Sequence, residues 1–74
     1  MFYSLWHLQS GNLVGNFDTQ EDALRFVRDT IETYGVDVAM PLALGTEDEN
    51  GETAAIAHGE ALIELVRRLP IGAD

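Results

Sequence analysis

The sequence contains no cysteine and no lysine, and its four basic residues, all arginine, stand against thirteen Asp and Glu residues. Without cysteine, the chain has no disulfide framework, no thiol nucleophile and no zinc–thiolate site. A nucleic-acid surface needs clustered Lys and Arg, and the net charge of −9 argues against one. We therefore expect no nucleic-acid partner. The acidic balance favours either simple solubility or attraction to a basic protein.

Long apolar runs are also missing, since no stretch approaches the ~18–20 apolar residues that span a bilayer. The apolar opening, residues 1–8, is interrupted by Ser4 and His7 and has no basic leader. We therefore expect a cytoplasmic protein with no membrane partner. A length of 74 residues with 46% hydrophobic and 23% charged residues indicates one globular domain, residues 1–74, with a thin core.

Two short apolar runs, residues 2–9 and 13–17, flank a Ser-Gly-Asn sequence that is typical of a hairpin turn. A two-residue turn would place Trp6 opposite Phe17. The face that we expect against the helices then carries Phe2, Trp6, Leu8, Leu13 and Phe17. The opposite face carries Tyr3, Leu5, His7, Gln9, Val14 and Asn16.

Helical periodicity follows this hairpin. Asp18 or Thr19 is a typical N-cap, and Gly35 stands where a helix commonly ends. Glu21 and Arg25 form an (i, i+4) pair on the expected wet side of this helix. Its apolar arc consists of Ala23, Leu24, Phe26, Val27, Thr30, Ile31 and Tyr34.

The second half of the chain repeats this pattern. Residues 42–46 are expected to form a strand, followed by an Asn-Gly turn at residues 50–51 and a returning strand over residues 52–57. A last helix spans about residues 59–69 and stops before Pro70. Its expected apolar stripe is Ala61, Leu62, Leu65, Val66 and Leu69.

These elements predict an α+β fold: a two-layer β-β-α-β-β-α domain with an antiparallel four-stranded sheet and two helices on one face. The two hairpin–helix units cover about residues 1–35 and 36–70. Asp22-Ala23-Leu24 and Glu60-Ala61-Leu62 match at a distance of 38 positions. Short connections favour pairing within each hairpin, with one strand from each unit joining the halves.

His7 and His58 are the residues best suited to acid–base chemistry or metal binding. We expect His58 on the apolar face at the start of the last helix, as a general base, a metal ligand or a histidine bonded to backbone. His7 is expected on the outer sheet face. The acids of residues 47–52 lack the ordered ligand pattern of a calcium loop and are better explained as a solvated, mobile tip. No phosphate cradle, nucleophile elbow or zinc-protease motif is present, so we expect no cofactor, no metal and no catalysis.

The remaining feature is apolar surface on the sheet face away from the helices. We expect the candidate interface there to consist of Tyr3, Leu5, His7 and Val14. This pattern favours a non-catalytic protein-interaction or regulatory module that forms a homodimer, with His7 near its mate. A small-ligand binder or enzyme that uses His7 or His58 is an alternative.

One segment resembles a known family. A hairpin followed by Asp18-Thr19-Gln20-Glu21-Asp22-Ala23-Leu24 is similar to the front half of HicB-type antitoxins, where a short sheet precedes an x-T-x-E-E-A-L helix. The resemblance covers about residues 3–32 and implies an inhibitor that masks a basic protein partner. The sequence differs from the HicB family in two ways: its second hairpin–helix unit does not follow the family pattern, and it has no counterpart of the DNA-binding appendage that the family usually carries. The whole chain resembles short bacterial proteins in a way that implies no activity.

Overall fold

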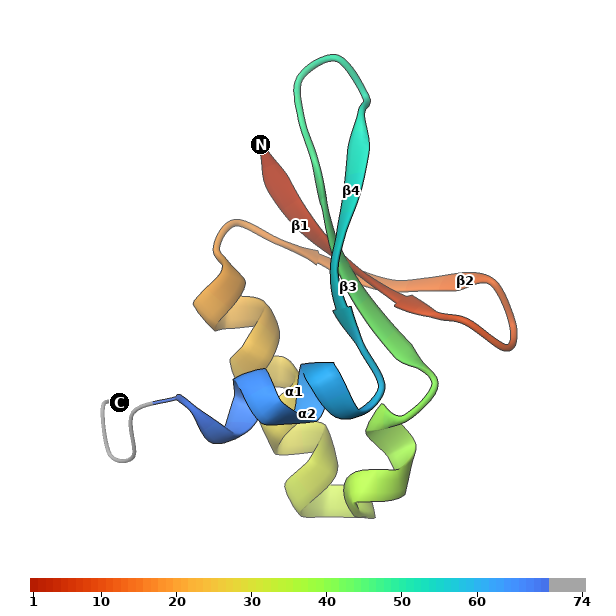
Figure 1. Ribbon diagram of the computed structural model, residues 1–74, viewed down its shortest axis with the longest axis vertical. Helices are drawn as coiled ribbons and strands as arrows, with labels where there is room; N and C mark the ends of the chain where they lie inside the picture. Colours follow the sequence, from red (N-terminus) through yellow and green to blue (C-terminus); the bar gives the residue numbers. More distant parts are fainter. Residues whose placement is uncertain (70–74) are drawn as a thin grey trace.

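A computed structural model describes residues 1–69 as a sheet of four antiparallel strands with two helices on one side (Figure 1). The strands are β1 (Phe2–His7), β2 (Asn12–Phe17), β3 (Leu42–Glu47) and β4 (Thr53–His58), in the order β2-β1-β3-β4. The helices are α1 (Gln20–Tyr34) and α2 (Glu60–Arg67). The predicted fold class and element order are confirmed. A short 3₁₀ helix, η1 (Val36–Ala39), was not predicted.

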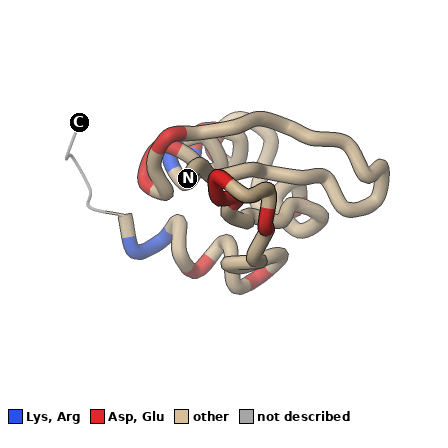
Figure 2. Tube along the Cα trace, turned by 90° about the horizontal axis from the view of Figure 1, so that it is seen from above, with Lys and Arg blue, Asp and Glu red and all other residues tan. Residues whose placement is uncertain are grey.

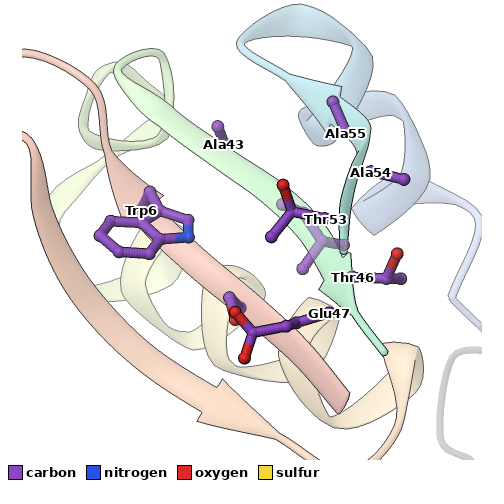
Figure 3. A pocket seen from close by; sticks show the side chains of 10 residues that line it. Trp6, Ala43, Thr46, Glu47, Thr53, Ala54 and Ala55 are labelled. Atoms are coloured by element: carbon purple, nitrogen blue, oxygen red, sulfur yellow. The ribbon is translucent and has the colours of Figure 1, made fainter. Parts of the chain in front are cut away.

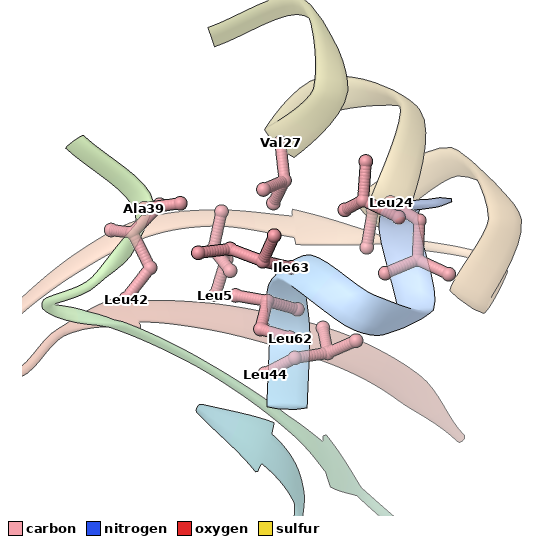
Figure 4. Close-up of a cluster of buried hydrophobic side chains, with 10 residues drawn as sticks. Leu5, Leu24, Val27, Ala39, Leu42, Leu44, Leu62 and Ile63 are labelled. Carbon is pink, nitrogen blue, oxygen red and sulfur yellow. The ribbon is translucent and has the colours of Figure 1, made fainter. Parts of the chain in front are cut away.

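The core lies between the helices and one face of the sheet (Figure 4). Leu5 and Leu44 pair across the central strands β1 and β3, and their exposed fractions are 0% and 1%. Leu42 of β3 and Ala39 of η1 extend this cluster. The two helices contribute Ala23, Leu24, Val27, Leu62, Ile63 and Val66.

The two hairpin–helix units are related by an approximate two-fold axis through the centre of the sheet. The register shifts in the two hairpins follow Leu5 of β1 and Leu44 of β3, so these two strands correspond at a shift of 39 positions, whereas the extra residues of β2 and β4, Val14 and Ile56, are 42 positions apart. The buried helix residues follow the shift of the central strands, with Ala23, Leu24 and Val27 corresponding to Leu62, Ile63 and Val66. The 38-position sequence match is therefore out of register by one, since Ala61 is exposed whereas Ala23 is buried. The predicted apolar stripe of α2 is therefore wrong at one position: Ile63 is buried and Ala61 is exposed.

Each hairpin contains one β-bulge, at equivalent places. The extra residue of β2 is Val14, opposite the step that follows Leu5, and the extra residue of β4 is Ile56, opposite the step that follows Leu44. Side chains two positions apart in a strand normally point to the same face. Where a bulge inserts an extra residue between them, they point to opposite faces. In β4, for this reason, Ala57 packs on the core while Ala55 faces away from it.

The predicted assignment of hairpin faces is wrong. Leu5 is fully buried, and Tyr3 packs against the core, so the helices cover the face that was expected to be open. His7 lies on the same side at the end of β1, and Val14 is the exposed bulge residue. The longer loop, residues 8–11, is not the cause, because Trp6 pairs with Leu13 and the two share one face as expected. The bulge then separates Phe17 from the face of Trp6.

Helix α1 begins and ends as its sequence indicates. The Thr19 side chain accepts a hydrogen bond from the Asp22 N–H at 3.1 Å, which makes Thr19 the N-cap. Gly35 has φ 99°, a backbone angle that favours glycine, and its N–H donates to the Ile31 carbonyl at 2.7 Å. The predicted pair of Glu21 and Arg25 is present at 3.3 Å. Within residues 1–69, neither helix has the length and apolar character needed to cross a membrane.

Candidate functional site

The sheet face opposite the helices, the outer face, carries three rows of side chains that run across the strands. The bulky row is Leu13, Trp6, Ala43 and His58. The small row is Asn16, Ser4, Gly45 and Ala55. The end row is Phe2, Glu47 and Thr53.

A hollow of about 270 Å³ lies over the small row. Figure 3 shows the indole of Trp6 on one side of the hollow and the side chains of Glu47 and Thr53 on the other. The Ser4 hydroxyl on its floor donates a hydrogen bond to Asn16 Oδ1 at 3.1 Å, which fixes that hydroxyl. The hollow therefore has a rigid floor of strand backbone and small side chains, and one aromatic wall.

Gly45 accounts for the depth of this hollow. A Cβ atom at this position would lie 2.9 Å from the carbonyl oxygen of Ala54, closer than real Cβ contacts allow. The bulge at Ile56 is opposite the step before Gly45, where β3 and β4 change register. A glycine is needed because β4 comes so close, and the missing side chain leaves the centre of the outer face open.

Large apolar side chains are exposed beside the hollow. Trp6 and Leu13 are cross-strand neighbours on β1 and β2, and their exposed fractions are 42% and 45%. The bulge residues Val14 and Ile56 are also exposed, one on each edge strand. A neighbouring pair of this size on a sheet face is typical of an interaction surface, whereas scattered exposed apolar residues are not.

The outer face is nearly free of charge although the chain has a net charge of −9. Glu47 is the only Asp, Glu, Lys or Arg residue in the four strands, and residues 1–17 contain none. Figure 2 shows the β1–β2 hairpin without red or blue segments, while acidic residues lie on the helices and on the β3–β4 loop. Within the described residues, the surface that presents Trp6 therefore carries one charged side chain, that of Glu47.

The structure does not bring the two histidines together. His7 and His58 lie on opposite faces of the sheet, because His7 pairs with Leu42 and His58 pairs with Ala43. His7 lies on the same face as the buried Leu5, so its predicted place on the outer face is wrong, and its Nδ1 accepts the Ser10 N–H at 3.3 Å in the hairpin turn. His58 is exposed in the bulky row rather than against α2. Among residues 1–69, no group of three or more His, Asp or Glu side chains is placed to hold a metal ion.

A second hollow, of about 530 Å³, lies between η1 and α2. Its lining residues are Val36, Asp37, Met40, Glu60, Ile63, Glu64 and Arg67. The Arg67 guanidinium lies 3.6 Å from the Glu64 carboxylate, and both side chains are mostly exposed. Long solvated side chains make a less defined wall than strand backbone does, so the outer face is the better-formed site.

Comparisons with family models, curated proteins and solved structures find no match to this chain. Trp6 and Leu13 were missed as site residues because the faces of the first hairpin were assigned the wrong way round. The sequence does hold one signal of the hollow. A glycine inside a strand, such as Gly45, commonly marks a bulge or a close approach of backbone.

Proposed function

We propose that this protein is a small, acidic, non-catalytic interaction module that binds a protein partner through its outer face. The supporting observation is Trp6, which is 42% exposed beside an open hollow and is held on a central strand. Tryptophan is enriched among the residues that dominate interface energies, and such residues cluster in well-packed pockets near the centre of an interface. Leu13 extends the same apolar surface on the neighbouring strand.

The shape of the hollow supports a protein partner over a small molecule. Its volume of about 270 Å³ is below the usual range for ligand pockets, ~300–1,000 Å³. Its floor offers few free polar groups, because the Ser4 hydroxyl is already bonded to Asn16. A single apolar side chain from another protein fits such a space, and the exposed Trp6 and Leu13 then lie against the surface around that side chain.

A basic protein is the second candidate partner. Glu47 ends the outer face, and the β3–β4 loop that follows it carries Asp48, Glu49 and Glu52. These acids would attract a partner whose Lys or Arg residues border an apolar patch. This is the kind of partner that the resemblance to HicB-type antitoxins implies.

Site-specific photo-crosslinking tests the proposal. A photoreactive amino acid at Leu13 is expected to give a discrete protein adduct in cell extract, and the Trp6→Ala background is expected to remove that adduct. The matched control carries the same group at Tyr34 of α1, which is 76% exposed and lies away from the sheet. Equal labelling from both positions, or no adduct from Leu13, would refute an interaction through the outer face. The mass of the adduct distinguishes a second copy of the chain from a basic protein.

A further inference from the structure

We infer that the outer face binds a second copy of this chain, giving a two-fold symmetric dimer in which Trp6 of each copy lies in the hollow of the other copy. This inference rests on the proposed function and names its partner. Three features of the structure support it: the distribution of large and small residues, the distribution of charge and the bulges in both edge strands.

Large and small residues are distributed in a self-complementary way. The approximate two-fold axis of the fold exchanges the bulky row with the small row, so that Trp6 corresponds to Gly45 and Leu13 corresponds to Ala55. The backbone is similar at equivalent places, but the first unit presents volume where the second unit presents a hollow. The bulky row and the small row run parallel, so a second copy that is turned over about an axis between them lays its bulky row on the small row of the first copy.

A dimer axis parallel to the sheet, between the bulky and small rows, produces this fit. It places Trp6 of each copy over Ser4 and Gly45 of the other, with the two sheets about 10 Å apart as in a β-sandwich. The same contact then occurs twice, as two-fold symmetry requires. Hydrophobic side chains fill both hollows, and water leaves both indoles.

Charge does not oppose this arrangement. Within the described residues, Glu47 is the only carboxylate on the outer face, where it lies in the end row and lines the hollow on the side away from Trp6. Since rows on one face are ~7 Å apart, the two Glu47 side chains of the dimer would be ~20 Å from each other. That separation exceeds the Debye length of ~8 Å at physiological salt. The other acids of residues 1–69 lie outside the four strands, on the helices, on η1 and in the loops, and stay outside the interface.

The edge strands are poorly suited to association by strand addition. Val14 interrupts the hydrogen-bonding row of β2, and Ile56 interrupts that of β4. Bulges of this kind are a common means of preventing edge-to-edge pairing. Two copies would therefore meet through their faces rather than extend the sheet.

The size of the outer face sets the expected affinity. Four strands of six residues form a face of roughly 19 by 20 Å, or about 400 Å² per copy. Twice this area is below the ~1,200 Å² at which interfaces of standard size begin. We therefore expect a dimer that depends on protein concentration, with a Kd on the order of micromolar or weaker.

Sedimentation equilibrium of the purified full chain, from about 1 µM to 1 mM, measures this Kd. Leu13→Glu is expected to weaken the dimer more than about tenfold, because the interface would bury the new carboxylate without a partner. Val36→Glu is the matched control, since Val36 is 43% exposed, like Leu13 at 45%, but lies on η1. A native protein that stays monomeric at 1 mM, or equal weakening by both substitutions, would overturn the dimer.

Crosslinking gives a readout that does not depend on a disruptive substitution. Because the chain has no cysteine, Ala43→Cys introduces a single thiol in the bulky row. The dimer places two copies of this thiol ~10 Å apart, within reach of a short bismaleimide. Ala43→Cys is expected to crosslink into dimers while Val36→Cys is not, and the reverse result would contradict the inference. If the purified protein is monomeric but Leu13 still labels another protein in extract, the dimer fails and the proposed function stands.

Discussion

At the scale of single residues, two leucines on opposite faces of the sheet show which face packs against the core. Leu5 has an exposed fraction of 0% and Leu13 one of 45%. We expect Leu5→Ala to lower the free energy of unfolding by about 2–5 kcal/mol, because it leaves a cavity in the core. Leu13→Ala, measured at a protein concentration that keeps the chain monomeric, should change it by less than about 0.5 kcal/mol. Denaturant titrations measure both values, and similar losses for the two variants would contradict the assigned faces.

The sequence could not decide between these faces. Both faces of β1 are apolar, with Tyr3 and Leu5 on one and Phe2 and Trp6 on the other. Alternation of apolar and polar residues identifies a buried face only where the opposite face is polar. The choice depends on the bulge at Val14, and a single extra residue of this kind leaves no clear mark on the sequence.

Gly45 provides a second test at this scale. Gly45→Ala is expected to destabilise the protein by about 1–3 kcal/mol, since the new Cβ would press on the backbone oxygen of Ala54, which cannot move away as a flexible side chain would. Gly15→Ala is the control, because its Cβ would meet the Phe17 ring at an ordinary distance of 3.5 Å. Thermal denaturation of both variants compares them. If Gly45→Ala is as stable as Gly15→Ala, the close approach of β4 does not account for the hollow.

At the scale of elements, prediction succeeds where a local chemical signal marks the boundary. Thr19 and Gly35 bound α1 because a side-chain oxygen and a glycine satisfy the needs of helix ends. The strands lie within one or two residues of their predicted limits. The 3₁₀ helix η1 and the two bulges were not predicted, because tertiary packing and register produce them. The outer hollow depends on one of these bulges, so the site was less predictable than the fold.

In the β3–β4 turn, one side chain adds to two backbone hydrogen bonds, from the Asp48 N–H to the Glu52 carbonyl and from the Gly51 N–H to the Asp48 carbonyl. Asp48 Oδ1 accepts the N–H groups of both Asn50 and Glu52 at 2.9 Å. Asp48→Ala is expected to lower the free energy of unfolding by ~1 kcal/mol, because both N–H groups lose this acceptor. Asp48→Asn removes the same charge but keeps an oxygen acceptor, and it should retain most of the stability. Hydrogen exchange at the amides of residues 50 and 52 reports the local effect, and equal exchange in the two variants would show that the side chain does not close the turn.

At the scale of the whole molecule, the topology follows from two small units that each lack a sufficient core. A hairpin with one helix buries too little apolar surface to be stable alone. Joining β1 to β3 places Leu5 beside Leu44 under both helices and completes one core. The expectation that one strand from each unit joins the halves is confirmed by the strand order β2-β1-β3-β4. The same approximate symmetry places the bulky row and the small row on the two sides of the centre of the outer face.

Net charge is also a property of the whole molecule, and it predicts how salt affects stability. At about 10 mM salt the Debye length is ~30 Å, so charges interact across a molecule whose extents are 35 × 29 × 17 Å. With a net charge of −9, these interactions are mainly repulsive in the compact state. Salt also weakens the ion pairs of Arg25 with Glu21 and of Arg67 with Glu64, but such exposed pairs contribute little.

Raising NaCl from about 10 to 150 mM should therefore increase the Tm. Relief of about 0.5 kcal/mol of repulsion corresponds to a rise of roughly 2–4 °C in a chain of this size. Glu49→Gln combined with Glu52→Gln removes two exposed charges from the β3–β4 loop and should make the rise smaller. The measurement is made at a protein concentration low enough to keep the chain monomeric, so that salt acts on folding alone. A Tm that falls with salt would mean that the exposed ion pairs outweigh the repulsion among the thirteen acids.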